Sequence, residues 1–356
     1  MKKKMDVLVD LQFGSTGKGA LAGFLSTLNG YDAVVSCNMP NAGHTAYCPF
    51  TGKKFVHKVL PSGIFSPELT VIAVGSGAVF SIDRLEEEWA NIAAHFGKEF
   101  MADVTLVIHE AAGILLPEHR EKEQATLSRI SSTMQGSAEA LISKIRREEG
   151  AIAKHNIIQI TERMNRHGKC VVVPQREWLE IMGNKKNILV EGSQGYSLSI
   201  SAGFYPFCTS RDCTPARVIA DCSLPVAWLR DTYGCCRVHP IRVGNTSDGY
   251  SGDWYPDQTE IHFSDLGVPD ETTTVTGRVR RIATFSFQQI AEAMLMAQPT
   301  AVFLNFANYD KTAAEVARLK INSAADFIGC EGVKFMGFGP LPGDIQQIDS
   351  MKGRGE

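Results

Sequence analysis

Residues 14–19 read Gly-Ser-Thr-Gly-Lys-Gly, and they follow the short apolar stretch Val-Leu-Val-Asp-Leu at residues 7–11. The residues that come next, 18–28, favour a helix. A strand, a glycine turn and a helix N-terminus in this order are typical of a phosphate-binding loop, because backbone N–H groups, the helix dipole and the loop lysine all attract an anion. The strict Walker A pattern requires a glycine where Gln12 stands and Ser or Thr where Gly19 stands. Taken alone, the loop predicts either a phosphate site or an ordinary tight turn.

Strand and helix signals alternate along the rest of the chain. Strands are expected at residues 33–37, 71–75, 104–108, 188–191 and 301–306, and helices at 82–95 (ended by Gly97), 137–148 (stopped by Gly150) and 285–298. This alternation predicts an α/β fold in which a mostly parallel central sheet carries helices on both faces. Residues 245–275 lack periodicity and are expected to form a long loop. Since no linker or repeat interrupts the pattern, we expect a single domain over residues 1–356.

Composition narrows the class of protein. The 356 residues are 44% hydrophobic and carry a net charge of −3, which argues against a protein that coats nucleic acid. No apolar run reaches the roughly 18 residues of a membrane span, and no signal-peptide pattern precedes Asp6. The nine cysteines include no CxxC pair, as suits reduced thiols. We therefore expect a cytoplasmic protein that binds neither nucleic acid nor membrane.

Further motifs follow the glycine loop in a fixed order. They are NAGHT at residues 41–45, EGSQG at 191–195, YPFCTS at 205–210, RVGN at 242–245, TGRVRR at 276–281 and Gly339-Pro340. The series resembles the adenylosuccinate synthetase family, whose corresponding patterns are GxxGKG, NAGHT, EGAQG, YPxVTS, RVGN, TGRxRR and a late GP. The matches run in order from residue 7 to about 340, nearly the whole chain. The resemblance implies a ligase that phosphorylates the 6-oxygen of a purine monophosphate and then displaces the phosphate with aspartate.

Two positions depart from the family pattern. Ser15 stands where the family's GDEGKGK loop has the aspartate that takes the proton from purine N1, and a serine hydroxyl cannot serve as that base unaided. Phe306 and Asn308 stand where the family has the lysine and aspartate of TKLD, which hold the base of GTP. An asparagine can instead pair with an adenine edge. We therefore expect ATP or dATP as the phosphate donor.

Both departures resemble the phage-type branch of the family, which acts on dGMP during synthesis of 2-aminoadenine for viral DNA. Guanine carries a 2-amino group beside N1, and the Ser15 hydroxyl leaves room for this group and can accept from it. The expected reaction is ligation of L-aspartate to C6 of dGMP through a 6-phosphoryl intermediate, giving N6-succino-2-amino-2'-deoxyadenylate. The alternatives left open are the ordinary reaction on IMP with GTP, a relative that has lost its activity with its base, a P-loop-like nucleotide kinase or ATPase, and a non-catalytic nucleotide-binding module.

The resemblance also implies roles for individual residues. Ser15, Lys18, His44 and Gln194 are expected at the reacting groups, with Lys18 on the transferring phosphate and His44 as the general acid, a task that suits an imidazole. Contacts to the nucleotide and its phosphates are expected from Gly14, Thr16, Gly17, Gly19, Asn41, Gly43, Thr45, Asn305, Asn308, Gly339 and Pro340. Contacts to dGMP are expected from Ser15, Asn41, Ser132, Thr133, Arg147, Gln194, Thr209 and Val243. Contacts to L-aspartate are expected from Thr274, Val275, Thr276, Arg278 and Arg280, whose guanidinium groups suit carboxylates.

A metal ion and a second subunit are implied as well. Mg²⁺ is expected beside Ser15 and the backbone carbonyl of Gly43, a weaker set of ligands than the family's because the loop aspartate is absent. The family is homodimeric, and Arg147 keeps the spacing of the arginine that reaches the 5'-phosphate of the neighbouring subunit. Because Arg146 is adjacent, an ordinary solvated arginine fits this stretch of sequence as well.

Overall fold

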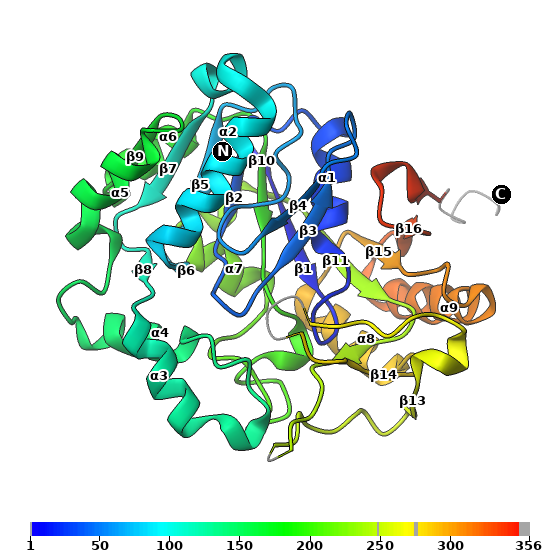
Figure 1. Ribbon diagram of the computed structural model, residues 1–356. Helices are drawn as coiled ribbons and strands as arrows, with labels where there is room; N and C mark the ends of the chain where they lie inside the picture. Colours follow the sequence, from blue (N-terminus) through cyan, green and yellow to red (C-terminus); the bar gives the residue numbers. More distant parts are fainter. Residues whose placement is uncertain (1, 248, 274–276, 349–356) are drawn as a thin grey trace.

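A ten-stranded sheet forms the centre of the molecule (Figure 1), in the order β17-β16-β15-β11-β1-β10-β2-β5-β7-β9. The computed structural model describes residues 2–247, 249–273 and 277–348. The strands of this sheet are β1 (Met5–Asp10), β2 (Ala33–Ser36), β5 (Val71–Val74), β7 (Thr105–His109), β9 (Cys170–Val173), β10 (Ile188–Glu191), β11 (Leu229–Arg237), β15 (Ala301–Asn305), β16 (Val333–Gly337) and β17 (Ile345–Gln347). Neighbouring strands pair in parallel, except that β17 runs antiparallel to β16. The predicted mostly parallel sheet is thus confirmed.

Helices cover both faces of this sheet. One face carries α1 (Lys18–Leu28), α2 (Ile82–Asp103) and α5 (Ile157–Met164), and the other carries α6 (Gln175–Gly183), α7 (Pro215–Asp221), α8 (Phe287–Ala297) and α9 (Lys311–Ile328). Strand side chains alternate between the two layers, so Leu8 of β1 packs into the first and Val7 and Val9 into the second. Both layers are apolar, which is why the strands read as continuous hydrophobic runs.

Smaller elements surround the carboxyl ends of the strands. They are the hairpin of β3 (His44–Tyr47) and β4 (Lys54–His57), the pair β6 (Val79–Phe80) and β8 (Gly113–Ile114), the three-stranded sheet of β12 (Ile241–Arg242), β14 (Arg281–Ala283) and β13 (Glu260–Ile261), and the helices α3 (Pro117–Thr126) and α4 (Ser137–Arg146). Apart from β13 and the short helical turn Phe263–Leu266, the described part of residues 245–275 has little regular structure, as expected.

Three predicted helix boundaries were wrong. The helix expected to end before Gly97 continues to Asp103, because the chain kinks at this glycine (φ 79°) and then resumes helical turns. The helix expected to reach residue 148 ends at Arg146, since Arg147 adopts the left-handed conformation (φ 62°) before Gly150 is reached. Helix α8 begins at Phe287 because the Ser286 hydroxyl accepts from the backbone N–H of Gln289 and caps it.

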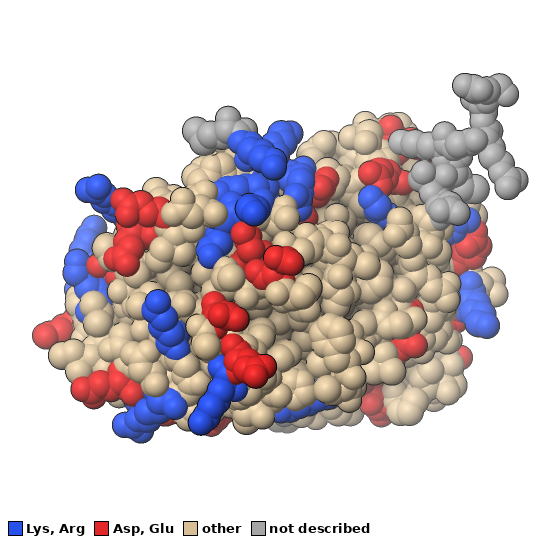
Figure 2. All heavy atoms as spheres, turned by 90° about the horizontal axis from the view of Figure 1, so that it is seen from above, with Lys and Arg blue, Asp and Glu red and all other residues tan. Residues whose placement is uncertain are grey.

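The surface mixes both signs of charge. In the view from above, acidic and basic side chains lie beside one another on the left half of the visible face, while much of the right half carries few charged groups (Figure 2). Within the described residues, no helix is both long and apolar enough to cross a membrane.

Candidate active site

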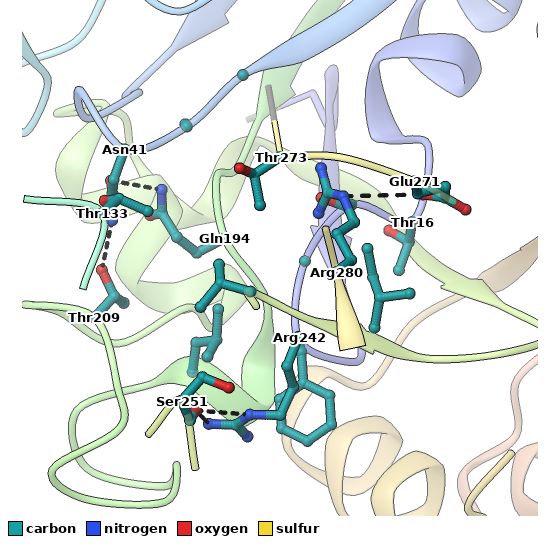
Figure 3. Close-up of a pocket in the computed structure, with 18 of the residues that line it drawn as sticks. Thr16, Asn41, Thr133, Gln194, Thr209, Arg242, Ser251, Glu271, Thr273 and Arg280 are labelled. Atoms are coloured by element: carbon teal, nitrogen blue, oxygen red, sulfur yellow. Dashed lines mark hydrogen bonds and ion pairs between the residues drawn. The ribbon is translucent and has the colours of Figure 1, made fainter. Parts of the chain in front are cut away.

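A pocket of about 340 Å³ lies at the carboxyl ends of the central strands (Figure 3). Its lining consists of residues 13–19 after β1, 41–45 after β2, 130–133, Gln194 and Leu198 after β10, 207–209, 241–243, Ser251, Glu271, Thr273, Arg280 and Phe306. Ligands of open parallel sheets bind at this edge, where strand order reverses and the loops diverge. Segments from most of the chain's length therefore meet in one cavity.

The glycine loop has the shape of a phosphate cradle. Gly17 (φ 90°) caps α1 in the left-handed conformation, and Ser15 (φ 55°) is also left-handed, so the loop turns sharply into the helix N-terminus. A Cβ on Gly17 would lie 2.0 Å from the amide nitrogen of Asn305, and one on Gly19 would lie 2.5 Å from the carbonyl oxygen of Thr45. Both glycines are therefore required for close packing, and the first N–H groups of α1 are available to an anion.

Lys18 is held in place inside this loop. Its ammonium lies 3.1 Å from a carboxylate oxygen of Asp10 and 3.0 Å from the backbone carbonyl of Gln194. The same Asp10 carboxylate accepts from the Thr16 hydroxyl at 2.5 Å and from the Gly14 N–H. Asp10 and Lys18 are both buried, so the charge of the lysine is balanced and its position is fixed.

Ser15 faces the arginine loop. Its hydroxyl accepts a hydrogen bond of 2.8 Å from Arg280, which also lies 3.9 Å from Glu271. Burial lowers the pKa of Arg280 to about 10, so this side chain stays cationic at neutral pH. Burial raises the pKa of Glu271, but the Arg237 guanidinium outweighs burial and holds it below its usual range. Ser15 thus lies beside a cluster of two arginines and one carboxylate.

Asn41, Gln194 and Thr209 form the opposite wall. The Gln194 amide nitrogen donates to Asn41 at 2.9 Å, and the Asn41 amide nitrogen donates to the Thr209 hydroxyl at 3.3 Å (Figure 3). Thr133 lies beside this group in the same view. Ser132 and Val243 also line the cavity. The wall therefore offers uncharged hydrogen-bonding groups, as suits a purine ring and its sugar.

Most of the predicted residues meet in this pocket. Those that line it are Gly14, Ser15, Thr16, Gly17, Lys18, Gly19, Asn41, Gly43, His44, Thr45, Ser132, Thr133, Gln194, Thr209, Val243 and Arg280. This clustering follows from the sheet, since the corresponding motifs come after neighbouring parallel strands.

Other predicted residues lie outside the pocket lining. Asn305 is buried behind the glycine loop, where its amide donates to the Thr16 carbonyl at 3.2 Å. Asn308, Pro340 and Arg147 are exposed, and Gly339 is half-buried. Arg278 donates to the backbone carbonyls of Ser131 and Ser132, both at 3.0 Å, and so ties the arginine loop to residues 130–133. Thr274, Val275 and Thr276 lie outside the described residues.

Several residues of the site were not found from the sequence. Asp10 ends β1 and accepts a hydrogen bond from the glycine loop. Its position shortly before that loop in the sequence could have indicated that it contacts the loop. Arg237 is fully buried, and its guanidinium lies 3.8 Å from the centre of the Phe306 ring. Glu271 comes from the segment without periodicity, so no pattern pointed to it. Arg242, in the RVGN motif, donates to the carbonyls of Ser251 and Phe207 and joins three pocket loops.

Comparison with known proteins agrees with this geometry. The family model described as adenylosuccinate synthetase matches residues 7–180 and 152–324. The chain belongs to the adenylosuccinate synthetase family. The family and the relatives named below indicate a ligase that forms a C–N bond with a nucleoside triphosphate, and the pocket has polar walls that suit such a task.

Phage proteins are among the relatives of this family member. The N6-succino-2-amino-2'-deoxyadenylate synthase of Vibrio phage phiVC8 is 44% identical over 351 residues, covering 97% of this chain and 98% of that protein. The synthase of the same name from cyanophage S-2L is 40% identical over 349 residues, covering 96% and 92%. The adenylosuccinate synthetase of Porphyromonas gingivalis (strain W83) is 29% identical over 318 residues, covering 78% and 72%.

Two solved structures have the same fold. The succinoaminodeoxyadenylate synthetase of cyanophage S-2L, solved with dGMP and with dATP as energy donor, superposes with a TM-score of 0.87 at 39% identity and covers 98% of this chain and 96% of that one. The fully ligated adenylosuccinate synthetase of Plasmodium falciparum gives a TM-score of 0.76 at 18% identity, covering 98% and 100%. The family fold therefore extends over nearly the whole chain.

Proposed function

We propose that this enzyme ligates L-aspartate to C6 of dGMP with ATP or dATP, giving N6-succino-2-amino-2'-deoxyadenylate. The observation that carries the proposal is Ser15, which lines the pocket at the position of the family's aspartate and accepts a hydrogen bond from Arg280. Its oxygen keeps a second lone pair for the 2-amino group of guanine. The phage relatives named for this product support the same substrate.

In the first step, O6 of dGMP attacks the γ-phosphorus of the triphosphate, and ADP or dADP leaves. Lys18, held in place by Asp10, stabilises the negative charge of the transferring phosphate. His44 donates a proton to the departing phosphate oxygen. The proton on N1 has to leave as O6 becomes phosphorylated. Ser15 cannot take it, and Glu271 is a weak base because Arg237 keeps its pKa low. Water or a phosphate oxygen is therefore the better acceptor in this scheme.

In the second step, the amine of L-aspartate attacks C6, inorganic phosphate leaves and the amine loses a proton. Arg280 lies at the pocket edge beside Ser15, so a carboxylate of aspartate bound there would bring its amine near C6. Arg278 would act on the same side by holding residues 130–133 against the arginine loop. Thr274, Val275 and Thr276 complete the aspartate site in this proposal.

Mg²⁺ fits the donors of the pocket, with most of its ligands coming from the substrate. Such an ion favours oxygen ligands and usually combines a few protein groups with phosphates and water. Gly43 lines the pocket and would hold the ion through its backbone carbonyl, whereas the Ser15 hydroxyl could bind it only in place of the hydrogen bond that it accepts from Arg280. No cluster of three or more acidic, histidine or cysteine side chains suited to a metal occurs among residues 2–247, 249–273 and 277–348. When bound, the ion would neutralise phosphate charge.

We further propose that the enzyme is a homodimer in which Arg147 reaches the 5'-phosphate bound in the other subunit. The side chain is exposed at the end of α4 and lies outside its own subunit's pocket lining. Mixing an Arg147→Ala variant with a Lys18→Ala variant tests this. Each variant alone should be nearly inactive, while hybrid dimers should contain one intact site and regain activity. Absence of recovery in demonstrated hybrids would contradict the proposal.

A substrate comparison tests the main proposal. Purified protein is assayed with aspartate, Mg²⁺ and either dGMP or IMP, each with ATP, dATP and GTP, while phosphate release and the succinylated nucleotide are measured. We expect turnover that requires aspartate and prefers dGMP. A clear preference for IMP would establish the ordinary family reaction instead. Phosphate release without aspartate would indicate a kinase or ATPase, and binding without turnover would indicate a non-catalytic module.

A further inference from the structure

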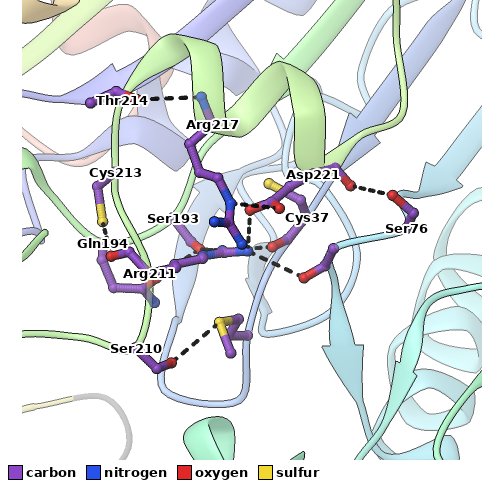
Figure 4. Close-up of polar contacts among 12 residues, drawn as sticks. Cys37, Ser76, Ser193, Gln194, Ser210, Arg211, Cys213, Thr214, Arg217 and Asp221 are labelled. Atoms are coloured by element: carbon purple, nitrogen blue, oxygen red, sulfur yellow. Dashed lines mark hydrogen bonds and ion pairs between the residues drawn. The ribbon is translucent and has the colours of Figure 1, made fainter. Parts of the chain in front are cut away.

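Arg211 is a buried arginine that the reaction scheme above does not use. Its guanidinium donates to the backbone carbonyl of Cys37 at 2.7 Å and to the Ser193 hydroxyl at 2.5 Å. It also donates to the Asp221 carboxylate at 3.0 Å and to the Gly77 carbonyl at 3.3 Å (Figure 4). One side chain thus joins the loops after β2 and β10, the turn before β6, and helix α7.

A chain of hydrogen bonds leads from this arginine to the pocket. The Ser193 hydroxyl donates to the side-chain oxygen of Gln194 at 3.0 Å. The Gln194 amide nitrogen donates to Asn41, whose own amide nitrogen donates to Thr209. Gln194, Asn41 and Thr209 all line the cavity, whereas Ser193 is 3% exposed and lies behind it. We call these five residues the polar relay.

The chemistry of arginine fixes the direction of every bond in the polar relay. A guanidinium can only donate, so the Ser193 oxygen must accept from Arg211. The single hydroxyl proton of Ser193 is then left for Gln194, which has to turn its carbonyl oxygen toward it. The Gln194 NH₂ group consequently faces Asn41 and the cavity. Asn41 in turn presents its oxygen to Gln194 and its NH₂ group to Thr209, whose hydroxyl proton stays available to a ligand.

We propose that Arg211 and Ser193 are positioning residues that make the purine side of the pocket a wall of donors, selecting ligands with an acceptor at C6. The second N–H of Gln194 suits the 6-oxo oxygen of guanine, and the Thr209 hydroxyl suits a phosphate oxygen. A 6-amino purine would place donor against donor, which leaves polar groups unpaired and weakens binding. The inference rests on the proposed function in that it takes a 6-oxopurine monophosphate as the substrate.

Ser193 is the position at which the polar relay can be cut with least damage to the fold. The family pattern has alanine there, so the EGSQG turn accommodates the loss of the hydroxyl. Arg211 is less suitable for substitution. The buried Asp221 carboxylate pairs with Arg211 and Arg217, and removal of Arg211 would leave it with Arg217 as its one remaining arginine partner. In Ser193→Ala, Arg211 keeps its other three partners while Gln194 becomes free to turn its amide over.

The experiment compares two ligands that differ in the group at C6 and in the proton on N1. KM and kcat are measured for dGMP, and the inhibition constant is measured for 2-amino-2'-deoxyadenosine monophosphate, in wild type and Ser193→Ala. We expect the preference for the 6-oxo ligand to fall about tenfold in the variant, mainly through a higher KM for dGMP, with kcat changed less. Ser76→Ala is the matched control. The Ser76 hydroxyl donates to the backbone carbonyl of Asp221, and this residue lies outside the pocket lining. The preference of Ser76→Ala for the 6-oxo ligand should equal that of wild type.

Two results would overturn the inference. One is an unchanged preference in Ser193→Ala, and the other is an equal loss of affinity for both ligands, which a merely structural role would produce. Thermal unfolding of each variant shows whether the fold survives. Failure of the proposed function is recognised separately, because wild type would then prefer IMP to dGMP. In that case the same comparison is made with IMP and AMP, which again differ in the group at C6 and in the proton on N1.

Discussion

The Nδ1 atom of His44 lies 3.5 Å from a carboxylate oxygen of Glu191, and both side chains are buried. The contact is longer than a good hydrogen bond, so the carboxylate acts on the imidazole mainly through its charge. The other oxygen of Glu191 accepts from the backbone N–H groups of Ser62 and Gly63 at 2.6 and 2.8 Å. Glu191 is therefore held rigidly beside the proposed general acid, with its charge close to the imidazole.

His44→Asn should lower kcat by about 100-fold or more, the usual scale for loss of a positioned acid. Glu191→Gln should lower kcat less, about tenfold, because the amide oxygen can still accept from the loop while the charge is lost. Steady-state kinetics measure both effects, and circular dichroism verifies that the fold is intact. Near-normal turnover of a folded His44→Asn enzyme would show that His44 has only a structural role.

Ser15→Asp should impair the use of dGMP instead of restoring a missing base. The new carboxylate would crowd the 2-amino group of guanine and would pair with Arg280, which now donates to the Ser15 hydroxyl. We expect kcat/KM for dGMP to fall at least tenfold, since a charge-assisted bond to arginine is worth roughly 1.5–3 kcal/mol. Assays of the variant with dGMP and IMP measure this, with Ser15→Ala as the control for loss of the hydroxyl alone. Improved use of dGMP in Ser15→Asp would contradict the role given to Ser15.

The phosphate donor should be an adenine nucleotide. Asn308 can both donate to and accept from adenine. It replaces the family's aspartate, whose carboxylate accepts hydrogen bonds from N1–H and the 2-amino group of guanine. We expect ATP and dATP to support turnover at least as well as GTP, with little demand for a 2'-hydroxyl. A wild-type enzyme that works with GTP and is nearly inert with both adenine nucleotides would refute this assignment.

Asn308→Asp should shift the preference toward GTP by about tenfold, the scale of one charge-assisted hydrogen bond. The shift should remain incomplete while Phe306 lies over the Arg237 guanidinium, because the family has a lysine at that position. Ratios of kcat/KM for GTP and ATP measure the change in Asn308→Asp. Asn308→Ala is the control, since it removes the amide without adding a charge.

Stability should fall between neutral pH and pH 5 through His239. Burial lowers the pKa of this histidine from 6.5 to about 4, with Arg237 adding to the shift and Asp310 opposing it. The unfolded chain therefore binds the proton first, and folding loses about 2 kcal/mol from this group between pH 7 and pH 5. Urea titrations at the two pH values should show a smaller loss in His239→Phe, which cannot titrate. Equal losses in both proteins would contradict this source of acid sensitivity.

The sequence predicted the parts of the site that are contiguous in the chain. The glycine loop, residues 41–45 and residues 191–195 each follow a strand of the central sheet, so finding the strands also placed the motifs at one edge. Glu271 and Arg211 belong to the site or its support through contacts with partners far away in sequence. Neither residue lies in a periodic pattern, and pairing between such distant side chains has no local signal.

Local conformation accounts for the remaining differences. Arg147 adopts a left-handed conformation that residue type does not predict, and it ends α4 earlier than its helical pattern indicates. At Gly97 the opposite occurs, because a residue that normally ends a helix only kinks it, and packing against the sheet continues on the first face. In both places tertiary structure overrides a local preference.

The position of β1 at the centre of the sheet has a consequence for how the enzyme is made. This strand is synthesised well before its two neighbours, which begin only at Ile188 and Leu229. The glycine loop that follows β1 cannot be fully packed until Asn305 has been made, because this residue fills the space behind Gly17. Contacts so distant in sequence form slowly, and an unpaired apolar strand is exposed to aggregation meanwhile. The nascent chain thus acquires its ability to bind nucleotide only after Asn305 has been made, and a chaperone that shields β1 until then would raise its yield.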